Sequence, residues 1–170
     1  MRIDVDGYTL RPAVEGDVAA IAAACVDAEI ARWLPHLPQP YGPEDARRFI
    51  AQADAWRVDG RELSLVIAGR DDALLGMIGL RLTDDPPTVG YWLAPGARGR
   101  GLATAATIAL ARWAFERYGM PRLALHAEPS NTASVRVAER SGFARVPGVI
   151  PGADHRDLWI FELERPEPDP

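Results

Sequence analysis

A glycine-rich segment has the composition of a phosphate-binding loop. Two glycines spaced by one residue stand between arginines in the stretch Arg98-Gly99-Arg100-Gly101-Leu102-Ala103-Thr104. Glycine lets the backbone come close to an anion, and the first N–H groups of a following helix point outward without intrahelical partners. The two arginines add positive charge at the same place. The segment therefore predicts a site where backbone amides bind a phosphate or pyrophosphate group.

The spacing of this loop excludes two common nucleotide motifs. A nucleotide P-loop needs Gly-Lys-Ser/Thr, and the chain contains no lysine. The dinucleotide pattern G-x-G-x-x-G also fails, because Gly99 and Gly101 are followed by Thr104. Two alternatives stay open at this point: a nucleotide-binding protein with an unusual loop, and a turn that merely ends a strand.

The elements on both sides of the loop form a strand, a loop and a helix. Residues 88–93 are apolar, aromatic or β-branched and predict a strand, which Pro95 and Gly96 end. A helix is expected from about Leu102 to Tyr118, and residues 122–127 predict a further strand parallel to the first. Asn131 or Thr132 then caps a short helix that runs to about residue 140.

The first half of the chain predicts one strand, two helices and a hairpin. Residues 8–11 form the strand, and a helix opened by Asp17 follows, with Cys25 on its apolar stripe as a core residue. An irregular proline-rich segment, 33–41, is expected to be a pocket wall or a surface loop. A helix begins at Pro43, and strands 63–68 and 74–82 form an antiparallel hairpin. In the second half of the chain, residues 157–163 predict the last strand.

Composition limits the class of protein. The chain has 170 residues, 48% apolar and 25% charged, which are ordinary globular values and predict one domain over residues 1–164 with an acidic tail, 165–170. No apolar run of about eighteen residues or more indicates a membrane span. A net charge of −5 argues against nucleic-acid binding. A single cysteine excludes an internal disulfide and favours a reducing, cytoplasmic location.

The chain resembles the GCN5-related N-acetyltransferases, the GNAT superfamily. Its loop matches their pattern R/Q-x-x-G-x-G/A, and the other matching stretches occur in the expected order: Leu10-Arg11-Pro12 then Asp17, Gly76-Met77-Ile78-Gly79, Val89-Gly90-Tyr91-Trp92, Asn131-x-x-Ser134 and Gly142-Phe143. Trp33-Leu34 before the proline-rich segment resembles the Rim-type branch of ribosomal-protein N-terminal acetyltransferases.

The resemblance implies a fold and a cosubstrate. The fold would be α/β, with a central mixed, mostly antiparallel twisted sheet, helices on both faces, and splayed fourth and fifth strands. Acetyl-coenzyme A would enter that gap, with its pyrophosphate on the amides of residues 98–104. Its pantetheine arm would lie along Tyr91, Trp92 and Leu93, and Asn131 would hydrogen-bond to the arm from the other side.

Acetyl transfer to an amine needs a base, an oxyanion donor and assistance to the leaving thiolate. His126 is the first candidate for the base, because imidazole titrates near neutral pH, at about 6.5. Glu128 is the alternative base, and it is also open that positioning and bulk water suffice. Ser134, three residues after Asn131, is expected near the sulfur. The oxyanion donor is expected to be a backbone N–H near Leu93.

Two departures leave the acceptor open. Relatives often carry Glu where this chain has Thr88, and a Glu-Gly pair where it has Val146-Pro147. A peptide N-terminus and an amine-bearing small molecule are therefore both retained as acceptors. The expected acceptor-side residues are Trp33, Leu34, His36 and Tyr41, with His155 and Asp157 at the rim.

These observations predict an N-acetyltransferase that moves an acetyl group from acetyl-coenzyme A directly to a primary amine. No metal is expected, because the three histidines and one cysteine form no cluster with ligand spacing. A non-catalytic acyl-coenzyme A-binding regulatory module is the alternative. Dimers are common in similar proteins, so a homodimer is also considered, although the sequence has no clear interface signal.

Overall fold

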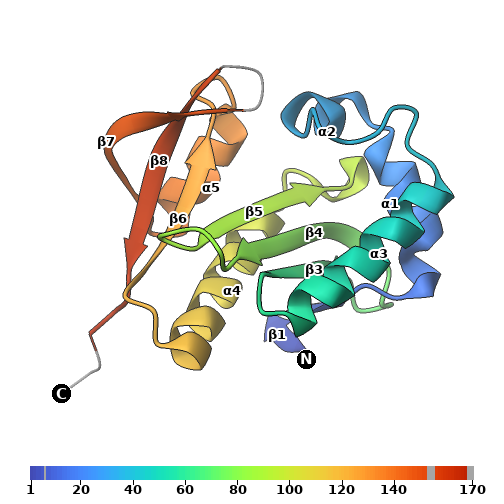
Figure 1. Ribbon diagram of the computed structural model, residues 1–170, viewed down its shortest axis with the longest axis horizontal. Helices are drawn as coiled ribbons and strands as arrows, with labels where there is room; N and C mark the ends of the chain where they lie inside the picture. Colours follow the sequence, from blue (N-terminus) through green and yellow to red (C-terminus); the bar gives the residue numbers. More distant parts are fainter. Residues whose placement is uncertain (6, 153–155, 168–170) are drawn as a thin grey trace.

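The strands form one sheet. The computed structural model describes residues 1–5, 7–152 and 156–167, and its sheet has eight strands in the order β1-β2-β3-β4-β5-β6-β8-β7 (Figure 1). Neighbouring strands are antiparallel except β5 and β6, which are parallel. The strands are β1 (Ile3–Val5), β2 (Tyr8–Pro12), β3 (Glu62–Ala68), β4 (Leu74–Arg81), β5 (Thr88–Leu93), β6 (Arg122–Ala127), β7 (Ala144–Pro151) and β8 (Asp157–Glu164).

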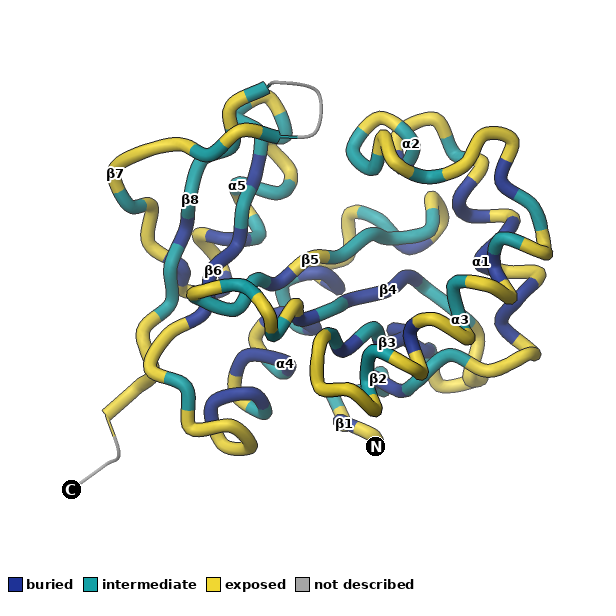
Figure 2. Tube along the Cα trace, viewed as in Figure 1, coloured by how far each residue is buried: buried dark blue, intermediate teal, exposed yellow. Residues whose placement is uncertain are grey.

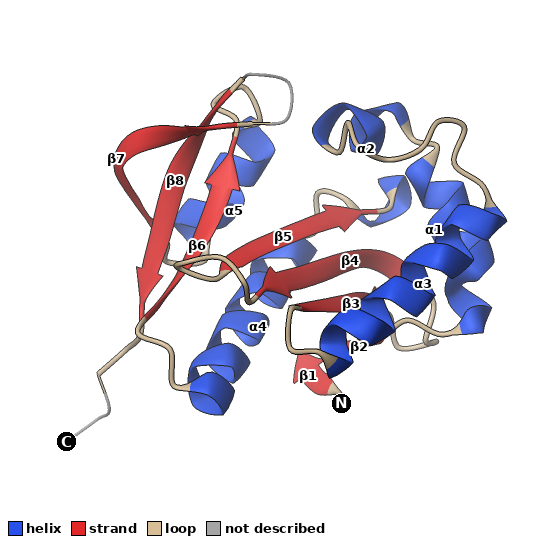
Figure 3. Cartoon of the chain, viewed as in Figure 1, coloured by secondary structure: helices blue, strands red, loops and turns tan. Residues whose placement is uncertain are grey.

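Helices cover both faces of this sheet (Figure 3). One face carries α1 and α3, the other carries α4 and α5, and α2 lies above the carboxyl end of β5. This arrangement confirms the predicted mixed, mostly antiparallel sheet with helices on both sides. The α-helices are α1 (Val18–Cys25), α2 (Ala28–Trp33), α3 (Pro43–Val58), α4 (Leu102–Tyr118) and α5 (Thr132–Arg140). Short 3-10 helices are η1 (Glu15–Asp17) and η2 (Pro95–Ala97).

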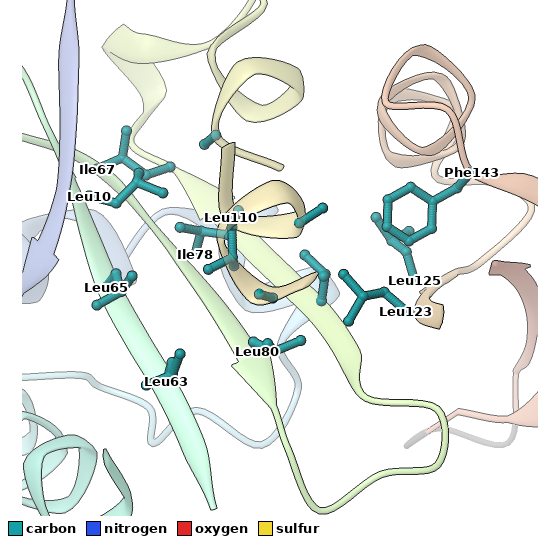
Figure 4. Close-up of a cluster of buried hydrophobic side chains, with 14 of the residues drawn as sticks. Leu10, Leu63, Leu65, Ile67, Ile78, Leu80, Leu110, Leu123, Leu125 and Phe143 are labelled. Carbon is teal, nitrogen blue, oxygen red and sulfur yellow. The ribbon is translucent and has the colours of Figure 1, made fainter. Parts of the chain in front are cut away.

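Alternating side chains of the strands make two separate cores. In β3, Leu65 and Ile67 face the α4 side, where Leu110 packs, whereas Val66 and Ala68 face α1 and α3. This follows from the two-residue repeat of a strand. Figure 4 shows the larger cluster around α4, and Figure 2 shows buried stretches in β4 and β6. Each face of the sheet is thus buried against its own helices.

The parallel pair β5 and β6 stays together over a short distance. The register between them comprises Thr88 with Ala124 and Val89 with Leu125, while β5 continues beside β4 as far as Leu93. A Cβ at Gly76 would lie 2.3 Å from the Trp92 carbonyl oxygen, so only glycine lets β4 approach β5 there. β5 and β6 are the strands expected from the sequence to be the fourth and fifth. Their numbers are higher by one because the unpredicted β1 precedes them.

A buried ion pair joins β2 to the start of α1. The Arg11 guanidinium donates to both carboxylate oxygens of Asp17, at 2.8 and 3.0 Å, and both residues are buried. Burial alone would raise the pKa of Asp17, but hydrogen bonds from Arg11 and the Val14 N–H hold it below its usual value. Removing Arg11 would leave the buried Asp17 carboxylate without its cation, whereas Arg11 keeps a second ion pair to Asp72 at 2.8 Å. The Leu10-Arg11-Pro12 and Asp17 motif is thus structural.

Two strands and one α-helix were not predicted. β1 was missed because its short polar sequence gains order by pairing with β2. α2 was missed although its N-cap is local: the Asp27 side chain accepts from the Ile30 N–H at 3.2 Å. β7 was not predicted, because proline and glycine are disfavoured inside strands; a register shift between Val146 and Val149 accommodates Pro147 and Gly148 in an edge strand.

Candidate functional site

A cavity of about 560 Å³ lies where β5 and β6 separate. Its walls come from β5, the glycine loop, the first turn of α4, the first turns of α5, β6 and α2. Predicted residues that line it are Trp33, Leu34, Tyr91, Trp92, Leu93, Arg98, Gly99, Gly101, Leu102, Ala103, Thr104, His126, Asn131 and Ser134. Most of the sequence-derived site therefore meets in one cavity.

The glycine loop presents backbone rather than side chains to this cavity. Gly99 and Gly101 have φ values of +77° and +73°, a region that residues with a Cβ rarely adopt. Gly101 is the N-cap of α4, so the N–H groups of the first turn point toward the cavity end of the helix. A 17-residue helix with free N–H groups at its N-terminus favours an anion there. The predicted start of this helix at Leu102 is confirmed.

The two loop arginines are both engaged by neighbouring groups of the protein, although Arg98 also lines the cavity. Arg98 pairs with Asp27 at 2.5 Å and Glu29 at 3.0 Å, and its Nε donates to the Leu93 carbonyl oxygen at 3.3 Å. The hydrogen bond from Arg98 lowers the pKa of Asp27. Arg100 donates to the Gly96 carbonyl oxygen and is not among the lining residues. In this structure Arg98 ties the loop to α2.

His126 lies on β6 with its side chain half-buried at the cavity wall. Its neighbours Leu125 and Ala127 point into the core around α4, so strand alternation directs His126 to the opposite face. Burial lowers the pKa of His126, and Arg81 lowers it further, while Asp84 and Glu162 oppose the shift. The neutral imidazole is therefore the favoured form near pH 7, as a proton acceptor requires.

Asn131, Ser134 and Tyr91 form a connected polar group at the start of α5. The Asn131 side chain caps the helix by accepting from the Ser134 N–H at 3.1 Å. The Ser134 and Tyr91 hydroxyl oxygens lie 2.8 Å apart and share a hydrogen bond. Burial raises the pKa of Tyr91 to about 12, and the bond to Ser134 opposes that shift. Sequence reasoning placed both residues at the cofactor but missed their contact, because they are 43 positions apart.

Other predicted residues lie outside the cavity. The Glu128 carboxylate pairs with Arg156 at 2.6 Å and accepts from Ser130. His36 is exposed, and Tyr41 is buried in the smaller core with α1 and α3. Cys25 belongs to the same core, where burial raises the pKa of its thiol to about 11, and its prediction as a core residue is confirmed. His155 lies outside the described residues.

Several lining residues were not predicted. Glu29 and Ile30 come from α2, whose existence was missed. Arg136 and Arg140, one helical turn apart on α5, also line the cavity. The sequence could have indicated these arginines, because they lie on the short helix that was predicted to follow Asn131. The cavity thus contains more positive charge than the loop sequence alone indicates.

Over residues 1–5, 7–152 and 156–167, no group of three or more His, Cys, Asp or Glu side chains is placed to bind a metal ion. Within the same ranges, no helix combines the length and apolarity that a membrane span requires.

Known proteins are similar to this chain in sequence and architecture. A sequence profile described as "Acetyltransferase (GNAT) domain" matches residues 8–144. A Bacillus subtilis (strain 168) protein named "Putative ribosomal N-acetyltransferase YdaF" is 31% identical over 147 residues, covering 81% of this chain and 79% of that protein. An acetyltransferase structure from Agrobacterium tumefaciens str. C58 is 27% identical with a TM-score of 0.78, covering 97% and 95% of the two chains.

A more distant structure shares the fold. RimL, described as a ribosomal L7/L12 alpha-N-protein acetyltransferase in complex with coenzyme A, has a TM-score of 0.81 at 20% identity, covering 96% of this chain and 98% of its own. The profile match spans the glycine loop, the splayed strands and α5, which together form the cavity. The chain belongs to the GNAT acetyltransferases and is an N-acetyltransferase that takes its acetyl group from acetyl-coenzyme A.

Proposed function

We propose that the acceptor is the α-amine of a protein N-terminus, with a small-molecule amine as the competing class. The observation that carries this proposal is the 31% identity to a relative whose name includes ribosomal N-acetyltransferase activity. Relatives often carry Glu where this chain has Thr88, but this difference does not oppose a protein acceptor. His126 lines the cavity and can accept the proton instead.

We infer that the coenzyme A phosphates bind at the N-terminus of α4, on backbone amides of residues 99–104. The positive φ values of Gly99 and Gly101 and the free N–H groups of the first helical turn support this placement. Arg136 and Arg140 supply the side-chain charge at the same cavity, because Arg98 is engaged with Asp27 and Glu29.

In the proposed reaction, the neutral amine nitrogen attacks the thioester carbonyl carbon. A C–N bond forms, the C–S bond breaks, and its electron pair stays on the coenzyme A sulfur. His126 takes the proton released by the amine, directly or through water. Ser134 donates a hydrogen bond to the departing thiolate. No acyl-enzyme is required, because Cys25 is buried in the core away from the cavity.

The acceptor is tested by supplying a matched panel with acetyl-coenzyme A and measuring product by mass spectrometry. The panel contains peptides with a free α-amine, the same peptides with a blocked α-amine and an internal lysine, and polyamine and aminosugar compounds. Acetylation of free N-termini, with blocked peptides and small amines at least tenfold slower, supports the proposal. Faster turnover of a small amine would assign the chain to the competing class.

Several sequence-based expectations remain predictions. They are the single domain over residues 1–164 with its tail 165–170, the cytoplasmic location, the homodimer and the oxyanion donor near Leu93. Residues 168–170 of the tail lie outside the described part of the chain. The expectation of an enzyme rather than a non-catalytic acyl-coenzyme A-binding module is supported by the acetyltransferase family and relative.

A further inference from the structure

The hydroxyl groups of Tyr91 and Ser134 meet across the gap between β5 and α5. Tyr91 comes from the part of β5 that has left β6, and Ser134 lies in the first turn of α5. Their oxygens are 2.8 Å apart, and both residues line the cavity. The Asn131 side chain accepts from the Ser134 N–H at 3.1 Å. Asn131 therefore holds the backbone of Ser134, while Tyr91 contacts its hydroxyl.

A serine hydroxyl has one proton and two acceptor lone pairs. If its proton points to Tyr91, the group cannot donate to a departing thiolate. If Tyr91 donates instead, the Ser134 proton is free to point into the cavity. Because a hydroxyl otherwise rotates freely, the direction of the Tyr91 bond decides whether Ser134 acts as a donor.

We propose that Tyr91 is a positioning residue for Ser134: its phenol donates to Ser134 Oγ, and this orients the serine O–H toward the coenzyme A sulfur. The inference rests on the proposed role of Ser134 at the thiolate. The electron pair of the broken C–S bond then stays on a sulfur that accepts the Ser134 hydrogen bond. The proton lost by the amine goes to His126, so neither hydroxyl needs to ionise.

The surroundings keep the phenol protonated. Tyr91 packs against the core around α4, and burial raises its pKa to about 12. It remains a donor over the whole range in which a thiol titrates. The charged or titratable side chains that share the cavity are Glu29, Arg98, His126, Arg136 and Arg140.

The experiment is a pH titration of coenzyme A bound to the full chain, followed by thiolate ultraviolet absorbance against the protein alone. The variants are Tyr91→Phe, Ser134→Ala and the double substitution. Tyr41→Phe is the matched control, because Tyr41 is a buried tyrosine in the other core whose pKa is also raised to about 12. Neither tyrosine therefore ionises within the titrated window. Melting of each free variant checks that it folds.

We expect Tyr91→Phe and Ser134→Ala each to raise the pKa of the bound thiol by about half a unit to one unit, with a three- to tenfold fall in kcat. The double variant should match the larger single effect, since the residues act as one donor. Tyr41→Phe should change neither quantity.

Two results would overturn the inference. An unchanged thiol pKa and kcat in Tyr91→Phe would show that the phenol only packs. Additive shifts in the double variant would show that the two hydroxyls act separately. A wild-type chain that binds no coenzyme A, seen as no change in melting, would instead overturn the proposed function, and this inference with it.

Discussion

The proposed cofactor side and the proposed acceptor side of the cavity are built in different ways. On the cofactor side, the loop 99–101 and the first turn of α4 present backbone amides whose direction follows from local φ values. On the acceptor side, Trp33 and Leu34 approach from α2, and His126 approaches from β6. One side is thus a continuous stretch of chain, whereas the other is assembled from segments far apart in sequence.

This difference explains why one scaffold can serve many acceptors. A backbone cradle depends on glycine and a helix N-terminus, and it binds the same phosphates whatever the surrounding side chains are. A wall made of side chains from separate elements changes with each substitution. Arg98 connects the two sides, because it begins the loop and pairs with Asp27 and Glu29 beside α2.

The largest effect is expected from Gly101→Glu on the cofactor side. At φ +73° a side chain is strained by about 1–2 kcal/mol, and the carboxylate would repel the phosphates. At about 100 times its Kd, acetyl-coenzyme A should stabilise the wild type by roughly 2.7 kcal/mol and this variant not measurably. Thermal melting with and without ligand measures both. Gly96→Glu is the control, because it adds the same charge at an open position outside the cavity and should retain the ligand-induced rise in melting temperature. A full rise in Gly101→Glu would reject the loop as the phosphate site.

His126→Ala should have the next largest effect, a fall in kcat of about a hundredfold or more, as expected for loss of a general base. Because burial lowers the pKa of His126, the acidic limb of the wild-type rate should lie below about pH 6.5, and activity should fall as the imidazole becomes protonated. A pH series of kcat/KM measures the limb, which the variant should lack. The exposed His36→Ala is the control. An unchanged limb in His126→Ala would remove His126 as the base.

The same pKa shift has a consequence for stability. The folded pKa of His126 is below the unfolded value of about 6.5, so the unfolded chain binds more protons as the pH falls. His126 therefore destabilises the fold progressively below about pH 6.5. Urea unfolding should show a smaller loss of stability between pH 7 and pH 5 in His126→Ala than in the wild type.

Arg98→Gln should have a moderate effect confined to the acceptor side. The ion pairs to Asp27 and Glu29 are partly exposed, so their loss is expected to raise the acceptor KM about two- to fivefold while acetyl-coenzyme A binding changes little. Steady-state kinetics with each substrate varied in turn separates the two. Arg100→Gln removes the other loop arginine, which has no ion pair to α2 among the described contacts. Equal loss of acetyl-coenzyme A binding in both variants would contradict the connecting role.

Glu128→Gln should have the smallest effect, less than about threefold on kcat. Its carboxylate is held by Arg156 at 2.6 Å and is not among the residues lining the cavity. Glutamine keeps the shape of the side chain while removing its charge, so the comparison with His126→Ala is direct. If kcat fell as far as in His126→Ala, the base would be Glu128.

Most of the fold could be predicted because its elements carry strong local signals. The apolar periodicity of residues 102–118 and the hairpin pattern of 63–82 gave the right elements within about two residues. The failures have two causes. β1 and β7 gain their order from neighbouring strands, and a pattern within one segment cannot report a partner that is distant in sequence. α2 had a local signal that was overlooked, because its N-cap Asp27 is only three residues from Ile30.

The sequence by itself determined the elements of the proposed cofactor side, since the glycines, the helix start and Asn131 act through neighbouring backbone. Only the tertiary structure decided which side chains face one another. It paired Arg98 with Asp27, buried Tyr41, and brought Tyr91 to Ser134. The physical reason is range: φ values and helix N–H groups are set within a few residues, whereas side-chain contacts depend on how the sheet brings distant strands and helices together.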